Sequence, residues 1–208
     1  MVYLLSFNYK NLKIKKFIDF AAYNKFMKQF TIILLIAIFF TFGLAGYKLF
    51  IAYTHPINYK NEIIEISHTY NLEPSIVASL INVESGYKQE AKSRKNAIGL
   101  MQIKLDTAIY IAELNNKNKP SETELFSPTI NIEYGCMYLQ YLNKKFENIY
   151  TALAAYNAGE TRVRSWLNST NYSNDGQTLC NIPYTETKNY IIKIKNNLKF
   201  YRKIYRNL

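Results

Sequence analysis

Cysteine and histidine are scarce in this 208-residue sequence, which contains only two of each. Two cysteines cannot build a disulfide framework, and His55 and His68 alone argue against a zinc cluster. The sequence also lacks a P-loop, a dinucleotide-binding fingerprint and a C-x-x-C pair. We therefore expect no metal site, no cofactor, and no nucleotide or redox chemistry.

Glycine and proline are also few, with seven and five residues respectively, which argues against a long disordered region. Apolar residues make up 49% of the chain, enough for a packed core. The length suits one domain of ordinary size plus an appendage.

The net charge of +11 is concentrated in two places. Residues 1–28 contain six lysines and one acid, Asp19, directly before an apolar run, so membrane topology explains this excess better than a nucleic-acid partner does. The second excess lies near the C-terminus, at Lys188, Lys193, Lys195, Lys199, Arg202, Lys203 and Arg206. It is either a solvated helix face or a surface attracted to a polyanion, such as a cell wall or anionic lipid.

The apolar run carries no charge from Phe30 to Tyr47 and extends, past Lys48, to about 23 residues. A helix of this length crosses the hydrocarbon layer of a membrane, and its preceding lysines place the N-terminus in the cytoplasm. We expect a basic cytoplasmic N-terminus over 1–29, a transmembrane signal-anchor helix over 30–53, and a domain over 55–208 outside the cytoplasmic membrane.

Two other interpretations of the apolar run stay open. A cleaved signal peptide requires a small-residue site, and Gly43-Leu44-Ala45 is a weak one, although a start at Met27 would make the run more signal-like. A buried core helix is the second alternative. Anchor and signal peptide agree that the following domain is exported.

The exported block reads as all-α, with at most a short β-hairpin. Helices are predicted from apolar spacing and from end signals such as Ser127-Pro128. The predicted helices cover 61–70, 106–114, 151–157, 160–167 and 186–206, and two more begin at 74 and at 128. Cys136 falls within a helix as a buried packing residue, and an exported location also permits a disulfide to Cys180.

Glu84 occupies an unusual position for a carboxylate. The apolar stripe of Val77, Leu80 and Ile81 continues by one turn to this residue. Burial there raises the pKa of a carboxyl and keeps it protonated near neutrality, as a general acid requires. Alternatively, the helix ends at Glu84 and the side chain reaches solvent.

The motifs around and after Glu84 occur in a family-like order. They are Glu84-Ser85-Gly86-Tyr87, Ala97 to Ile103, Asn131-Ile132 with Gly135, Ala154 to Gly159, and Ile182 to Tyr190. Over residues 60–206 this set resembles the soluble-lytic-transglycosylase family of the lysozyme-like superfamily. The resemblance implies a lysozyme-like α-helical domain that acts on peptidoglycan glycan strands and is held at the cytoplasmic membrane by the N-terminal helix, with protein partners unspecified.

The resemblance also implies a reaction. The bond between N-acetylmuramic acid and N-acetylglucosamine is cleaved, and the muramyl 6-hydroxyl closes onto C1 to leave a 1,6-anhydro end. Glu84 is the expected sole acid/base, because the matching motifs contain no evident second carboxylate at the spacing that two-carboxylate glycosidases need.

Further residues match family positions that bind substrate: Ser85, Gly99, Met101, Gln102, Tyr156, Asn157, Glu186 and Tyr190. The resemblance implies that Ser85 orients substrate or the helix end, that Gly99 permits close backbone approach, and that Gln102 bonds the adjacent sugar. Tyr156 is expected beside Glu84. Asn157 is expected to stabilise the local turn, and Glu186 to meet the stem peptide. Tyr156 and Tyr190 are alternatively core aromatics, and Glu186 a first-turn helix charge.

The sequence departs from the family at Lys104-Leu105, where Met-Pro is usual. Lys104 either contacts a stem-peptide carboxylate or points away from the cleft. Two other functions are kept. One is a goose-lysozyme-like muramidase, which uses water and which a second carboxylate in the cleft would favour. The other is a catalytically weak peptidoglycan-binding scaffold.

Overall fold

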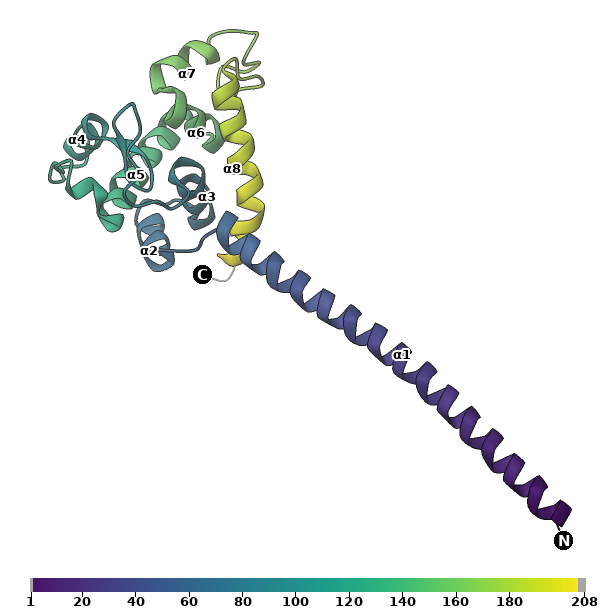
Figure 1. Cartoon of the computed structure of the whole chain (residues 1–208). Coiled ribbons are helices and arrows are strands. Elements are labelled where there is room, and N and C mark those ends of the chain that lie inside the picture. Colours follow the sequence, from purple (N-terminus) through teal and green to yellow (C-terminus); the bar gives the residue numbers. More distant parts are fainter. Residues whose placement is uncertain (1, 206–208) are drawn as a thin grey trace. The chain divides into compact units, whose positions relative to one another are not determined.

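The computed structural model describes residues 2–205, with side chains described for Phe20 and from Tyr23 onward. The chain divides into two compact units between Ile51 and Ala52. The predicted helix end at Arg206 and the side chains of Lys10, Lys13, Lys15 and Lys16 lie outside the described residues. The first unit belongs to helix α1 (Val2–Thr54), and the second holds all the other described elements (Figure 1).

Helix α1 contains a segment that is long and apolar enough to cross a membrane. Tyr23–Thr54 spans 32 residues with a mean hydropathy of 2.3, and its most apolar window is 0% buried. That exposure contradicts the core-helix alternative. A membrane anchor and a signal sequence are the two interpretations that agree with it.

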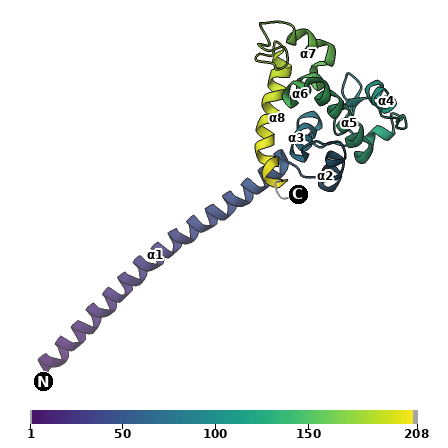
Figure 2. The ribbon, with the colours of Figure 1, turned by 180° about the vertical axis from the view of Figure 1, so that it is seen from behind.

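The second unit is helical, as predicted, with one small hairpin. Its elements in chain order are α2 (Lys60–Thr69), α3 (Pro74–Ser85), β1 (Ala97–Ile98), β2 (Ile103–Lys104), α4 (Leu105–Leu114), the 3₁₀ helix η1 (Glu124–Phe126), α5 (Pro128–Phe146), α6 (Ile149–Ala158), α7 (Glu160–Leu167) and α8 (Thr185–Ile204). Helix α3 packs against α2 and α8, and α5 against α4 and α6. From behind, α8 runs along one side of this group (Figure 2).

The ends of the helices follow from local chemistry. Pro74 and Pro128 stand at the first positions of α3 and α5, where a missing N–H costs no hydrogen bond. Ser127, predicted as an N-cap, makes no side-chain capping bond. Asn148 caps α6 instead, because its side-chain oxygen accepts from Tyr150 N and Thr151 N, each at 3.0 Å. Helix α6 therefore begins two residues before the predicted start.

The hairpin is held by a buried asparagine from α5. Strands β1 and β2 pair Ala97 with Lys104 and Ile98 with Ile103. Asn131 is 0% exposed; its Nδ2 donates to Ile98 O at 2.9 Å and to Leu125 O at 2.7 Å, and its Oδ1 accepts from Met101 N at 2.7 Å. The side chain thus bonds two backbone groups of the hairpin and one of η1.

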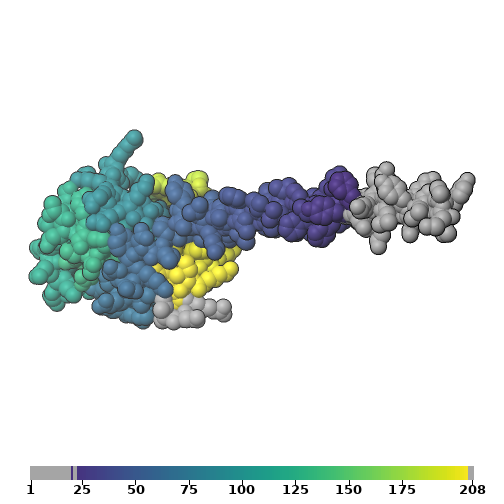
Figure 3. Space-filling view, turned by 60° about the horizontal axis from the view of Figure 1, so that its bottom comes forward, coloured from purple at the N-terminus to yellow at the C-terminus, as the bar shows by residue number. Residues whose placement is uncertain are grey.

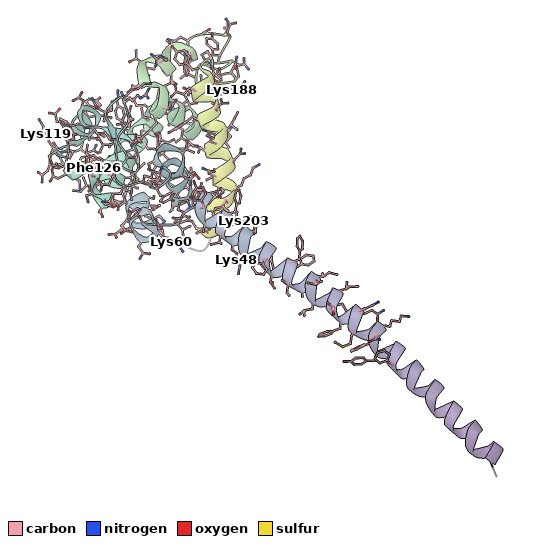
Figure 4. The ribbon with its side chains drawn as sticks, in the orientation of Figure 1. Lys48, Lys60, Lys119, Phe126, Lys188 and Lys203 are labelled. Atoms are coloured by element: carbon pink, nitrogen blue, oxygen red, sulfur yellow. The ribbon has the colours of Figure 1, made fainter. Side chains whose placement is uncertain are left out.

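Helix α8 carries the predicted basic face. Lys188, Lys193, Lys195, Lys199 and Lys203 are exposed, and Figure 4 labels Lys188 and Lys203 at opposite ends of the helix. Arg202 instead pairs with Glu73 before α3, at 2.9 Å and 3.0 Å. The space-filling view shows the C-terminal end of α8, in yellow, at the surface of the domain (Figure 3).

The two cysteines lie in different environments. Cys136 is 0% exposed within α5, and burial raises the pKa of its thiol. Cys180 is exposed in the loop before α8, and both thiols are free. Cys136 therefore packs in the core as predicted, and the structure contains no disulfide between the two.

Candidate active site

Glu84 lies in the last turn of α3, half-buried, and lines a cleft of about 590 Å³. The pKa of its carboxyl is raised from 4.5 to about 7, mainly because burial desolvates the charged form and also because Glu186 lies nearby. The Tyr190 hydroxyl donates to Glu84 Oε1 at 2.6 Å, which lowers the pKa. Near neutral pH, the Glu84 carboxyl therefore carries a proton in a large share of the molecules, and this proton can be donated.

Two buried tyrosine hydroxyls lie close to the acid. Tyr190, on α8, is 6% exposed and bonds Glu84 directly. Tyr156, on α6, donates instead to Met101 O at 2.8 Å, so it supports the hairpin turn rather than the carboxyl. Burial and the Glu84 charge raise the pKa of both phenols, which keeps them neutral donors.

Ser85 ties the end of α3 to the hairpin. Its Oγ donates to Leu100 O at 2.8 Å and back to Ile81 O at 3.2 Å. Of the two roles expected for Ser85, the structure shows the one at the helix end. This contact keeps the peptide that carries Glu84 next to the turn.

Gln102 lines the cleft from the turn between the strands, with a left-handed φ of 47°. Its Nε2 donates to Gly99 O at 2.9 Å and to Ala91 O at 3.1 Å. Among the described residues nothing donates to its Oε1, so that oxygen is free to accept from a ligand.

Gly99 and Met101, whose predicted role is substrate binding, pack inside the domain in this structure. Both are buried and neither lines the cleft. A Cβ at Gly99 would lie 2.2 Å from Asn131 Nδ2, so the close approach that glycine permits here is to α5. Met101 is 0% exposed and packs on Gly135, where a Cβ would lie 2.4 Å from its sulfur. The bonds to Asn131 turn this part of the motif inward.

Asn157 and Glu186 line the cleft from α6 and α8. Asn157 Oδ1 accepts from Thr187 Oγ1 at 2.8 Å, so it joins the two helices rather than stabilising a local turn. Glu186 is exposed in the first turn of α8. It and Glu84 are the carboxylic acids among the described residues that line the cleft.

Several cleft residues were not predicted as site residues. Tyr138, on α5, is half-buried, lines the cleft and packs on Tyr156 with ring centroids 5.2 Å apart. Arg162, on α7, lines it as well. Their spacing gave no signal, because helices from distant parts of the chain form the cleft. Lys104 also lines the cleft.

The fold and the site together define a class of protein: a helical domain whose open cleft holds a half-buried carboxyl with a pKa near neutrality. Among the described residues, no three His, Cys, Asp or Glu side chains lie together as metal ligands would. The arrangement suits proton transfer to a bound ligand.

Comparisons with known proteins identify the family. The model of the transglycosylase SLT domain matches residues 61–179. A membrane-bound lytic murein transglycosylase E from Buchnera aphidicola is 33% identical over 152 residues, covering 68% of this chain and 66% of that protein. The soluble lytic murein transglycosylase of Salmonella typhimurium is 31% identical over 150 residues, covering 71% and 23%. The chain belongs to the transglycosylase SLT domain family.

Solved structures show the same fold. An inactive mutant of lytic transglycosylase Slt from Pseudomonas aeruginosa superposes with a TM-score of 0.66 at 26% identity, covering 74% of this chain and 25% of that one. The 70 kDa soluble lytic transglycosylase of Escherichia coli gives 0.64 at 28% identity, covering 72% and 25%. This chain therefore matches about a quarter of each solved relative and just under two thirds of the Buchnera protein.

Proposed function

We propose that this chain is a membrane-anchored lytic transglycosylase that cleaves peptidoglycan glycan strands, with Glu84 as the acid and base. The observation that carries the proposal is the carboxyl of Glu84 in an open cleft, with a pKa raised by burial to about 7. The names of the relatives supply the substrate class. One solved relative is inactive when a glutamate is replaced by glutamine, which agrees with a reaction that depends on a glutamate.

In the first step, protonated Glu84 gives its proton to the oxygen that joins N-acetylmuramic acid to N-acetylglucosamine. The bond between C1 and that oxygen breaks, the N-acetylglucosamine part leaves as an alcohol, and positive charge develops at C1. In this proposal the neighbouring N-acetyl group, and not Glu186, stabilises this centre.

In the second step, the muramyl 6-hydroxyl oxygen bonds to C1 and its proton passes to the Glu84 carboxylate. The products are a 1,6-anhydro end and a protonated acid, so the enzyme returns to its starting state. No water is consumed. Tyr190 holds Oε1 throughout and stabilises the carboxylate that exists between the two proton transfers.

We also propose that α1 anchors the protein in the cytoplasmic membrane with its N-terminus inside. Lysines precede the apolar segment, and Tyr23–Thr54 is long enough to span the hydrocarbon layer. The cleft then acts on the cell-wall side of the membrane.

The test is mass spectrometry of peptidoglycan digested by the full chain in detergent. Muropeptides lighter by one water than ordinary reducing ends are expected. They should be absent with Glu84→Gln, which keeps the shape of the side chain but cannot donate the proton, and present with Glu90→Gln, an exposed control. A folded protein that binds sacculi without releasing products would contradict catalysis and indicate a binding scaffold.

A hydrolytic muramidase is the second candidate, and Glu186 is the observation that favours it, because this carboxyl lines the same cleft. A hydrolase would give reducing ends, and Glu186→Gln would abolish them if Glu186 activates water. For a transglycosylase, Glu186→Gln should leave the anhydro product in place, since the 6-hydroxyl replaces water.

A further inference from the structure

The cleft wall is strongly basic. Four of its lining residues carry positive charge: Arg94, Lys95, Lys104 and Arg162. The acids that line it among the described residues are Glu84, which is largely neutral at moderately acidic pH, and Glu186. The cleft therefore presents an excess of positive charge to whatever enters it.

The fold gathers these cations from separate segments. Because β1 and β2 pair Ala97 with Lys104, Lys104 lies beside the loop that carries Arg94 and Lys95. Arg162 extends from α7. It donates to Ala158 O at 2.9 Å, and its guanidinium lies 4.9 Å from the Tyr184 ring centroid, which limits its movement.

None of the four cations forms an ion pair with a described carboxylate, although their neighbours do. Two residues before Arg94, Lys92 pairs with Glu122 at 2.5 Å. Two residues after Arg162, Arg164 pairs with Glu160 at 2.7 Å. The neighbouring charges outside the cleft are thus compensated within the protein, whereas those lining the cleft are left for a ligand.

The glycan itself supplies no counter-charge. Its sugars are neutral where the lactyl group of N-acetylmuramic acid is amide-bonded to a stem peptide, and the free carboxylates are then those of the peptide. We propose that Lys104, with Arg94, Lys95 and Arg162, selects glycan strands whose stem peptides carry free carboxylates. This inference rests on the proposed function and names the chemical form of the substrate.

Lys104 is the residue on which to test it. Its side chain is exposed, and it takes part in strand β2 and in the start of α4 through its backbone, so replacing the side chain should not disturb the fold. Lys104→Gln removes the charge and keeps a polar chain of moderate length. Lys144→Gln, at an exposed position on α5 away from the cleft, is the matched control.

The experiment compares soluble, uncross-linked strands with the same strands after carbodiimide amidation of their carboxylates. Full chain in detergent is used for cleavage rates, and its Glu84→Gln form for equilibrium binding. We expect the wild type to prefer the carboxylate strands, with Lys104→Gln raising KM on these by about threefold to tenfold and leaving kcat unchanged. KM on amidated strands and every value for Lys144→Gln should stay the same. The preference should shrink as salt rises from low ionic strength to about 1 M.

Amidase-treated strands, which keep only lactyl carboxylates, separate the two sources of negative charge. If Lys104→Gln weakens binding to these strands as much as to intact ones, the stem peptide is not the ligand and the inference is overturned. Equal wild-type binding to carboxylate and amidated strands overturns it as well. Cleavage of all strands at equal rates would also overturn the inference, but it would leave the proposed function intact. Preferential binding with no cleavage would support the cationic wall and contradict the proposed function instead.

Discussion

The two tyrosines near Glu84 serve different purposes, and the distinction rests on one hydrogen bond each. Tyr190 donates to the carboxyl at 2.6 Å, whereas Tyr156 donates to the Met101 carbonyl at 2.8 Å. A donor to a carboxylate favours its charged form and lowers its pKa. Tyr190 thus partly opposes the effect of burial, and the acid retains a pKa close to neutrality.

Replacing Tyr190 with phenylalanine should therefore move the pH dependence of cleavage. Removal of the donor raises the pKa of Glu84, so the protonated acid persists to higher pH and the alkaline limb of kcat/KM shifts upward, by about half to one pH unit. The rate of the reaction is also expected to fall, since the intermediate carboxylate is less stabilised. A pH–rate profile on soluble strands measures both.

Tyr156→Phe is the matched control for this prediction. It removes a buried hydroxyl of the same kind but leaves the hydrogen bond to Glu84 intact. Its alkaline limb should stay in place even if the domain loses stability. An upward shift of equal size in both variants would show that general loosening of the cleft, and not the Tyr190 bond, sets the pKa.

The burial of a residue could be predicted from the sequence where it depends on the apolar spacing within a single helix. Glu84 follows an apolar stripe on a single helix, so its entry into a partly buried position was readable from spacing. The burial of Gly99 and Met101 could not be predicted in the same way. Their orientation depends on Asn131, some thirty residues later in the chain. No local sequence pattern predicts the three hydrogen bonds that its side chain forms.

At the scale of elements, the hairpin is the part most dependent on a distant helix. Its turn contains left-handed residues, and its backbone is satisfied by Asn131 rather than by a longer ladder. Two strands of two residues each would not persist without such support. The hairpin carries Gln102 and Lys104 to the cleft, so its stability is also the stability of the site.

Two glycine substitutions test this dependence. Gly99 has a φ of +73° and no room for a Cβ beside Asn131, whereas Gly86 has a φ of +59° with nothing within 4 Å. Gly86→Ala should cost about 1 kcal/mol of unfolding free energy, from backbone strain alone. Gly99→Ala should cost roughly 3 kcal/mol or more, because Asn131 must also move. Urea denaturation gives both values, and similar losses for the two would contradict the role of Asn131.

Helix positions followed the sequence closely, and the exceptions have physical causes. Helix α7 has the predicted bounds, since Gly159 before it and the apolar spacing within it are both local signals. The 3₁₀ helix η1 was not predicted, because its three residues are too few to show a period. For the same reason, the sequence predicted at most a short hairpin.

At the scale of the whole molecule, the second unit begins slightly before the boundary expected at residue 55. Asn82 Nδ2 donates to Thr54 O at 3.0 Å, and the Tyr201 hydroxyl donates to Pro56 O at 2.8 Å. The His55 ring lies 4.3 Å from the Phe200 ring, centroid to centroid. The segment after the apolar run therefore forms part of the folded domain.

Two truncated proteins should differ measurably for this reason. A chain starting at Ala52 keeps the whole second unit, and one starting at Asn58 loses both backbone acceptors and the His55 ring. We expect the shorter chain to unfold with roughly 1–3 kcal/mol less free energy and at a lower temperature. Calorimetry of the two proteins measures the difference, and equal stabilities would show that residues 52–57 act only as a tether.

The hydrogen bond between Glu84 and Tyr190 joins positions 106 residues apart. Synthesis proceeds from the N-terminus, so the helix that carries the acid is complete long before the ribosome reaches α8. Until α8 docks, the acid lacks its phenolic donor and the cleft lacks the wall that bears Glu186. The order of chain growth thus delays completion of the site, and a growing chain does not acquire its finished site until its last helix has been made.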